Sequence, residues 1–296
     1  MESSQASVGL QRPQAFHTMS LGLLVMLPTL MFLMISLFVV FLFHSVQPVI
    51  WVVVAICLLV SLVFMSARKV HMRDSPNFWL NLGSLCALAT VAATAASLYN
   101  WQRHLARYWA YEGQRAYTNV LPSEPALSHL DAGRLLFSAD ARLDFAGAGV
   151  HGDSGRLCVA PILGSAPQAT VEYWAAGVGC CGPAGNFSCG AADDNQARGG
   201  LVFLTDGAAA GLLDGFRRAA RHVGAARGLP PSADALFVQW VADPQEAQRG
   251  IWGEGMRFLV GSAAAYLGLS VVAGTALHCC RRAPAKSRLE DRRFAP

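Results

Sequence analysis

Four long apolar runs dominate the pattern of hydrophobic and polar positions along the chain. The runs cover residues 21–43, 49–67, 78–98 and 258–277, and none contains Asp, Glu, Lys or Arg. A helix needs about 20 apolar residues to cross the roughly 30 Å hydrocarbon core of a bilayer. Each run is therefore long enough for one transmembrane helix, and the pattern predicts a multi-pass integral membrane protein with four spans.

The charged residues outside the runs indicate the orientation. Segments 1–20, 68–77 and 278–296 carry ten Lys and Arg against four acids, whereas segment 99–257 carries thirteen Arg, no Lys and fifteen acids. Lys and Arg in short flanking segments stay on the cytosolic side. We therefore expect a cytosolic N-terminus, a cytosolic loop and a basic cytosolic tail. Segment 99–257 becomes an extracellular or lumenal domain, in the plasma membrane or an endomembrane.

The spans carry small residues rather than charged ones. The spans contain no Asp, Glu, Lys, Arg or His, and the two histidines nearest to them, His44 and His278, stand at span ends. Small residues recur at a spacing of four, at Gly83/Ala87, Ala89/Ala93/Ser97, Gly261/Ala265, Ala264/Gly268 and Ser270/Gly274. Such spacing lets helix backbones approach closely. It predicts tight association of the third and fourth spans or pairing with another protein, unless Ala and Gly are simply abundant there.

The large segment shows mixed patterning. Short β-like runs lie at 134–137, 157–162, 170–178 and 236–241. One helix is predicted between the last two runs, with an apolar face formed by Leu212, Leu213, Phe216, Ala219, Ala220 and Val223. Thr205 or Asp206 can cap this helix, and Gly224 or Gly228 can end it.

Helices are also predicted to join this segment to the spans. The third span is expected to continue to about Tyr117, and a second helix is expected to start at Pro244 and to lead into the fourth span. The predicted fold class is a membrane all-α four-helix bundle. A small disulfide-stapled α+β domain lies between its third and fourth helices.

The eight cysteines divide by compartment. Cys57 and Cys86 lie within spans as packing residues. Four more lie in the large segment, at Cys158, Cys180, Cys181 and Cys189. On an oxidising face four thiols predict two disulfides with three possible connectivities. A bond between neighbouring Cys180 and Cys181 would be strained, so each is expected to pair with Cys158 or Cys189.

Two modification sites follow from short motifs. Cys279 and Cys280 directly precede Arg281 and Arg282 at the end of the fourth span, and juxtamembrane cysteines beside basic residues are typical palmitoylation sites, although they can equally be free cytosolic thiols. Asn186-Phe187-Ser188 is an acceptor sequence for N-glycosylation. Both motifs agree with the orientation predicted from charge.

The four spans, the short first outer loop, the basic inner loop and Cys180-Cys181-Gly182 in a large second outer loop resemble the tetraspanins. This resemblance implies that the cysteine motif anchors disulfides, with Cys189 as a later partner, that the loop recruits partner proteins and that juxtamembrane cysteines are lipidated. Tetraspanins have a further cysteine shortly before the fourth span, and residues 250–257 contain none. The stretches 158–162 and 173–181 are also similar to uncharacterised protist multi-pass proteins.

Two enzyme-like signals have simpler interpretations. Gly152-Asp153-Ser154-Gly155 matches the string around the nucleophile of trypsin-like proteases, but the segment is too short for their two barrels, and a Gly-Asp turn is favoured. His151 with the four outer cysteines could form a zinc site. Adjacent cysteines on an oxidising face favour disulfides instead. No catalytic residue, metal or cofactor is predicted.

A cluster of arginines is the remaining surface feature. Arg217, Arg218, Arg221 and Arg227 share the polar side of the predicted helix. Such a run is commonly a solvated face, and the alternative is a contact with an anion or an acidic partner. We take Arg217, Arg218 and Arg221 as candidate partner-binding residues.

These observations predict a non-enzymatic membrane organiser or scaffold that recruits partner proteins through its large outer loop. Its expected partners are membrane lipids, other membrane proteins met laterally and a further copy of itself, and not nucleic acid. The alternatives are an auxiliary subunit of a channel or transport complex, and a receptor for a small ligand or glycan.

Overall fold

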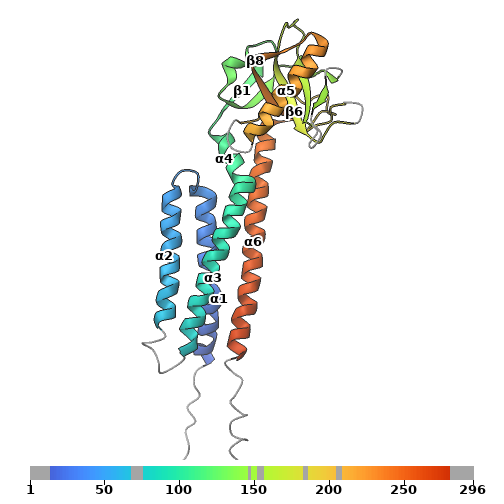
Figure 1. Cartoon of the computed structure of the whole chain (residues 1–296). Helices are drawn as coiled ribbons and strands as arrows, with labels where there is room; N and C mark the ends of the chain where they lie inside the picture. Colours follow the sequence, from blue (N-terminus) through green and yellow to red (C-terminus); the bar gives the residue numbers. More distant parts are fainter. Residues whose placement is uncertain are drawn as a thin grey trace, which may run out of the picture. The chain divides into compact units, whose positions relative to one another are not determined.

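The computed structural model describes residues 14–67, 76–145, 148–151, 157–182, 186–204 and 209–280. They belong to two compact units. The helical unit joins the residues up to Arg103 with those from Gly255 onward, and the sheet unit comprises His104–Glu254 (Figure 1).

The helical unit contains α1 (Gln14–Leu42), α2 (Gln47–Ser66), α3 (Pro76–Asn100) and residues 255–280 of α6 (Pro244–Cys280). Four helical stretches are long and apolar enough to cross a membrane, namely Leu21–Leu42, Gln47–Ser66, Phe78–Glu112 and Pro244–Leu277. The expectation of four spanning helices is confirmed to this extent. The type of membrane and the positions of the termini stay predictions, and most of segments 68–77 and 278–296 lies outside the described residues.

Helix α3 packs against α1 and α2 through its small residues. A side-chain carbon at Gly83 would lie 2.6 Å from Met65 Cγ and 2.7 Å from the backbone oxygen of Ser61, so only glycine allows this approach. Further along α3, the buried Ser97 hydroxyl donates a hydrogen bond to Ser36 Oγ on α1 at 3.1 Å. Small residues and interhelical hydroxyl bonds are the usual means of helix association in lipid.

Helix α6 makes fewer contacts within the helical unit. Tyr266 stacks on Phe32 with 4.5 Å between ring centroids, and the Ser270 hydroxyl donates to the Val25 carbonyl at 3.3 Å. By contrast, a side-chain carbon at Gly261 or Gly268 would meet no atom within 4 Å. Gly83, Ala89, Ala93 and Ser97 of α3 are therefore buried, whereas Gly261 and Gly268 of α6 lie on an open face.

The predicted fold class is wrong. Helix α6 is a single helix of 37 residues that starts in the sheet unit, and 17% of its apolar window is buried, so the helices do not form a separate bundle. The sheet is also large rather than small, with eight strands. Sequence patterning missed half of those strands because β1, β3, β4 and β7 are short, exposed or glycine-rich.

The helix that enters the sheet unit ends earlier than predicted. A π-helix at Trp101–Leu105 follows α3, and α4 (Ala106–Glu112) follows the π-helix. Strand β1 then begins at Arg115, so the segment up to Tyr117 is not helical. Tyr108 on α4 packs on Trp252 of α6 with 4.8 Å between ring centroids, which joins the two helices within the sheet unit.

The mixed sheet has the strand order β1-β2-β7-β8-β6-β5-β3, with β4 paired to β5. The pairs β1–β2 and β6–β8 are parallel and the other pairs antiparallel. The strands are β1 (Arg115–Val120), β2 (Ala132–Phe137), β3 (Arg142–Leu143), β4 (Gly149–His151), β5 (Leu157–Leu163), β6 (Val171–Val178), β7 (Gly199–Val202) and β8 (Pro231–Val241). The four predicted runs correspond to β2, β5, β6 and β8, and β8 starts five residues earlier than predicted.

Each face of the sheet has its own core because side chains alternate along a strand. Trp174 and Phe237 point to the face covered by α5 (Ala209–Arg227), where Phe216 belongs to the same buried cluster and stacks on Phe237. Tyr173 and Trp240 point to the other face and belong to the cluster that includes Cys158, Cys181 and Cys189. The predicted apolar face of the helix is confirmed, since Leu213, Phe216, Ala219 and Ala220 are buried.

Candidate functional site

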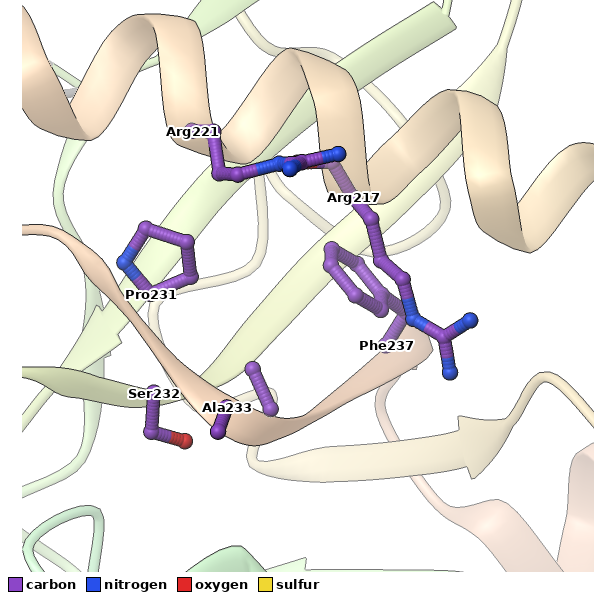
Figure 2. Close-up of a pocket in the computed structure, with 7 residues that line it drawn as sticks. Arg217, Arg221, Pro231, Ser232, Ala233 and Phe237 are labelled. Carbon is purple, nitrogen blue, oxygen red and sulfur yellow. The ribbon is translucent and has the colours of Figure 1, made fainter.

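A groove lies between α5 and the first half of β8 in the sheet unit (Figure 2). Its first cavity has a volume of about 290 Å³. The cavity is lined by Arg217, Arg221, Pro231, Ser232, Ala233, Ala235 and Phe237. A second cavity of about 180 Å³ shares Arg217, Ala233, Ala235 and Phe237 and continues towards Gln114 and Leu130. Because the two cavities share these residues, we treat them as one site, the α5–β8 groove.

The turn after α5 places the start of β8 beside the helix. Helix α5 ends at Arg227, and Gly228 follows with a φ of +68°, a conformation that favours glycine. Pro230 and Pro231 then start the extended chain. Gly228, one of the two residues predicted to end the helix, is thus the one that ends it. Figure 2 shows Arg217 and Arg221 on the helix opposite Pro231 and Ser232 on the strand.

A break in strand pairing opens the groove on the β8 side. Val171 of β6 pairs with Pro231, but Tyr173 pairs with Leu236, so residues 232–235 stand opposite the single residue Glu172. On the other edge of β8, the ladder with β7 extends only to the pair Val202–Val238. Such a bulge redirects side chains and interrupts the hydrogen-bonded ladder.

Glu172 holds the bulge in place. Its Oε2 accepts hydrogen bonds from the Ser232 hydroxyl at 2.8 Å and from the Ala126 backbone N–H at 2.9 Å. Its Oε1 accepts a bond from the Thr170 hydroxyl at 3.2 Å. With these three donors the Glu172 carboxylate fixes the shape of the bulge.

The structure brings together two of the three candidate arginines. Arg217 and Arg221 line the groove, whereas Arg218 is exposed on α5 and is not a lining residue. Arg217 Nη1 lies 3.2 Å from Asp214 Oδ1 in a solvent-exposed ion pair. Arg221 Nε donates to the Arg217 carbonyl at 3.4 Å, which orients the side chain along the helix. Arg227 instead approaches Asp144 at 3.9 Å.

The groove combines exposed basic side chains with an apolar wall. Phe237 and Leu213 are 2% and 5% exposed and form part of the wall, and Asp234 is an acidic residue of the second cavity. The lining residues include no His, Cys or Lys. This arrangement suits the binding of a ligand that carries a negative charge beside an apolar group.

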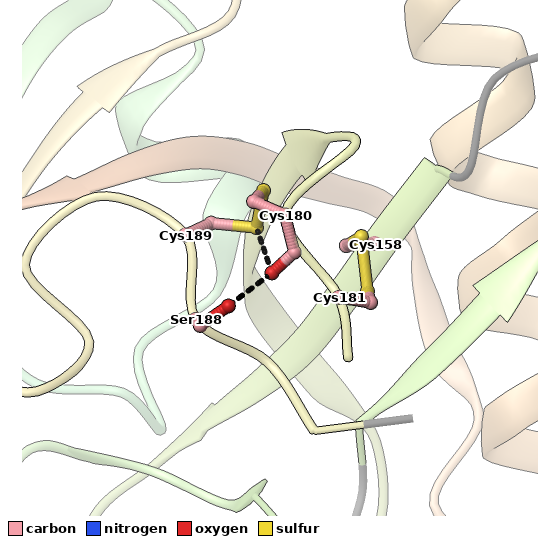
Figure 3. Close-up of a disulfide and its surroundings, with 5 residues drawn as sticks. All are labelled: Cys158, Cys180, Cys181, Ser188 and Cys189. Carbon is pink, nitrogen blue, oxygen red and sulfur yellow. Dashed lines mark hydrogen bonds between the residues drawn. A yellow bond between two sulfur atoms is a disulfide. The ribbon is translucent and has the colours of Figure 1, made fainter. Parts of the chain in front are cut away.

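The four cysteines of the sheet unit form two disulfides, Cys158–Cys181 and Cys180–Cys189 (Figure 3). The prediction of disulfides in this segment is confirmed, and the structure selects one of the pairings that the sequence left open. The Sγ atoms of Cys158, Cys180 and Cys189 lie within 4.8 Å of one another. In these bonds the sulfurs have no thiolate to offer a zinc ion, and the side chain of His151 lies outside the described residues.

Gly177 makes room for this cysteine cluster. It pairs with Cys158 across strands β5 and β6. A side-chain carbon at Gly177 would lie 2.5 Å from Cys180 Sγ and 2.6 Å from Cys189 Sγ. Sequence reasoning missed this residue, although the short stretch from Gly177 through Gly179 to the cysteine pair could have indicated a crowded turn.

The predicted modification sites have different surroundings. Asn186 is exposed, and its backbone carbonyl accepts a hydrogen bond from the Gly182 N–H at 3.0 Å. The Ser188 hydroxyl donates to the Cys180 carbonyl at 2.6 Å. Glycosylation of Asn186 stays a prediction. Cys279 and Cys280 form the end of α6, but their side chains lie outside the described residues.

A buried polar chain was missed because its members are far apart in sequence. Tyr173 and His129 are buried, with 2.9 Å between the tyrosine hydroxyl and His129 Nδ1. His129 Nε2 lies 3.9 Å from Glu124 Oε2. Burial raises the pKa of Tyr173, and the nearby carboxylates Glu124 and Glu172 add to this effect. The hydroxyl therefore stays protonated, and the chain acts as a structural link between the short helix at Ala126–His129 and β6.

No known protein family, curated protein or solved structure matches this chain.

Proposed function

We propose that this protein is a non-enzymatic membrane organiser that recruits partner proteins through its sheet unit. In this proposal the sheet unit faces the extracellular or lumenal side and both termini are cytosolic. The α5–β8 groove is the observation that carries the proposal, because it combines exposed cationic side chains with an apolar wall on a disulfide-bonded domain.

The open shape of the groove favours a protein partner over a buried small ligand. Ligand pockets commonly bury most of the ligand surface. Exposed residues such as Ala233 and Arg221 line this groove, so a bound ligand would stay partly in contact with solvent. A shallow groove of this kind suits a short segment of a partner whose remaining surface rests elsewhere.

The open face of α6 supports lateral contact within the membrane. Large apolar side chains such as Val260 and Val272 are 67% and 65% exposed, and Gly261 and Gly268 lie on the same helix without close neighbours. Lipid is the default cover for such a face, and other membrane helices can replace it. A partner protein recruited by the sheet unit could then place its own transmembrane helices against the open face of α6.

The absence of lysine from segment 99–257 allows a selective test. Arg221→Lys places one amine at the groove, and Arg142→Lys places one on β3, an end strand that β6 and β5 separate from β8. Membranes containing the full chain would be treated with an amine-reactive bifunctional cross-linker. Wild type supplies the background from Lys69 and Lys286.

We expect the Arg221→Lys chain to form discrete protein adducts that wild type and Arg142→Lys do not form. A pore-forming protein in these adducts would favour the auxiliary-subunit alternative, and varied membrane proteins would favour the organiser. If neither introduced amine yields adducts above the wild-type background, recruitment through the sheet unit is wrong.

A further inference from the structure

Arg217 and Arg221 give one end of the groove a positive charge that the single carboxylate of Asp214 balances only in part. Within the described residues, Arg221 has no carboxylate within ion-pair distance, and the partner of Arg217 is the exposed Asp214 at 3.2 Å. An exposed pair of this kind contributes only about 0–1 kcal/mol, so a ligand can compete with it. Guanidinium groups bind carboxylates through paired N–H donors. This end of the groove therefore favours a carboxylate.

Beyond the arginines the groove mixes apolar and polar groups. The second cavity shares Arg217 with the first and adds the buried Leu213 and the partly buried Phe203 and Leu236. Asp234 lines this part as well and would oppose a second negative charge there. The charge pattern thus favours one acidic group beside the arginines, and the apolar side chains of the second cavity can contact apolar groups next to that acid.

The β8 bulge adds main-chain groups to the site. Residues 232–235 are out of register with β6, and Ala233 and Asp234 are exposed. Backbone N–H and C=O groups outside a ladder are available to an extended chain, which is the basis of peptide recognition by strand addition. A glycan or a free anion would use the arginines but not this combination of main-chain and apolar contacts.

We infer that the α5–β8 groove binds an extended segment of a partner protein in which an Asp or Glu side chain adjoins apolar residues. The carboxylate contacts Arg217 and Arg221, and the apolar residues lie against Leu213 and Phe237. This inference rests on the proposed recruiting function and specifies the chemistry of the recruited partner.

A library of random displayed peptides provides the test, because it makes no assumption about the natural partner. The full chain in lipid nanodiscs would be used as wild type, as Arg217→Glu/Arg221→Glu and as Arg218→Glu. Arg218 is the matched control because it lies on the same helix, is exposed and does not line the groove.

We expect wild type and Arg218→Glu to enrich peptides with an acid beside apolar residues. The double variant should bind those peptides at least about tenfold more weakly, and raising the ionic strength from about 0.05 M to about 0.5 M should weaken wild-type binding. Replacing the peptide acid by its amide should have an effect similar to that of the double variant.

The inference is overturned if no peptide is enriched, if the enriched peptides lack acids, or if the double variant retains them. Binding of heparin that depends on Arg217 and Arg221, without acidic peptides, would assign the groove to sulfated glycans and would also overturn it. Adducts from the Arg221→Lys cross-linking would still support recruitment in each of these cases, so the two proposals can fail separately.

Discussion

The cysteine-bridged region, which comprises residues 158, 177–182 and 186–190, lies in the same sheet unit as the α5–β8 groove. The two regions differ in how many of their reactive or charged groups have a partner within the chain. In the first, all four sulfurs are bonded and Gly177 leaves no space for a side chain. In the second, two guanidinium groups are exposed and a strand leaves its register. We infer that the cysteine-bridged region contributes mainly to stability and the groove mainly to recognition.

Strand β8 shows the same contrast within one element. Its second half, including Phe237, Val238 and Trp240, is buried and pairs with both β6 and β7. Its first half borders the groove and includes the exposed Ala233 and Asp234. The buried half anchors the strand, and Glu172 together with the Val171–Pro231 pair holds the bulged shape of the open half.

The largest effect is expected from filling the space at Gly177. In Gly177→Val the new side chain would overlap the Cys180–Cys189 disulfide, because even its first carbon would lie about 2.5 Å from Cys180 Sγ. We expect the sheet unit not to fold, as protease sensitivity of the full chain would show. Gly179→Ala is the control, because its side-chain carbon would meet no neighbour and only its positive φ is strained. Equal protease resistance of Gly177→Val and wild type would contradict the crowded cluster.

Removing one disulfide should have the next largest effect. Cys158→Ala/Cys181→Ala removes a disulfide between cysteines that are 23 residues apart in the sequence. The loss should lower the free energy of unfolding by about 2–5 kcal/mol. Thermal unfolding of the full chain would measure this loss, and non-reducing mass mapping would verify the remaining bond. Cys57→Ala, at a buried free cysteine of α2, removes a thiol without removing a disulfide. If the double variant unfolds at the same temperature as wild type, the Cys158–Cys181 disulfide does not stabilise the fold.

Charge reversal at the groove should change binding but hardly change stability. Arg217→Glu/Arg221→Glu removes one exposed ion pair, and surface substitutions of this kind usually change the free energy of unfolding by less than about 1 kcal/mol. The melting temperature of the full chain should therefore stay close to that of wild type and of Arg218→Glu. A large drop would show that the arginines serve the fold, and the contrast between the two regions would fail.

The smallest effect concerns Asp140, which lies outside both regions. A hydrogen bond from the Ser138 hydroxyl, with further bonds from the Ser165 backbone and hydroxyl, holds the pKa of Asp140 well below its usual range. A depressed folded-state pKa stabilises the fold above the unfolded value of about 3.9, and this contribution is lost as the pH falls towards the folded value. The free energy of unfolding should therefore decrease below about pH 4, less steeply in Asp140→Asn than in wild type. The exposed Asp193→Asn should follow wild type, and equal slopes in all three would rule out this role.

Local patterns predicted the helices and the buried strands but not their assembly. The apolar runs and the face at Phe216 are continuous in sequence, so periodicity revealed them. The pairing of β8 with β6 and β7, and of Cys158 with Cys181, depends on contacts between distant segments. The arginine cluster could be recognised in the sequence. The sequence could not show that Arg217 and Arg221 line the groove and that Arg218 does not, because the groove depends on the bulge at residues 232–235.

Zero-length coupling with a carbodiimide shows most directly whether the α5–β8 groove binds a carboxylate of a partner protein, because this reagent joins an amine only to a carboxylate in contact with it. Arg221→Lys and Arg218→Lys both keep the positive charge, and each supplies the one lysine of segment 99–257. If the groove recruits partners through the arginines, membranes containing Arg221→Lys will yield a partner adduct linked through an Asp or Glu side chain, which Arg218→Lys and wild type will not yield. Equal coupling from the two lysine variants, or coupling from neither, would contradict the assignment of the groove as the recruiting site.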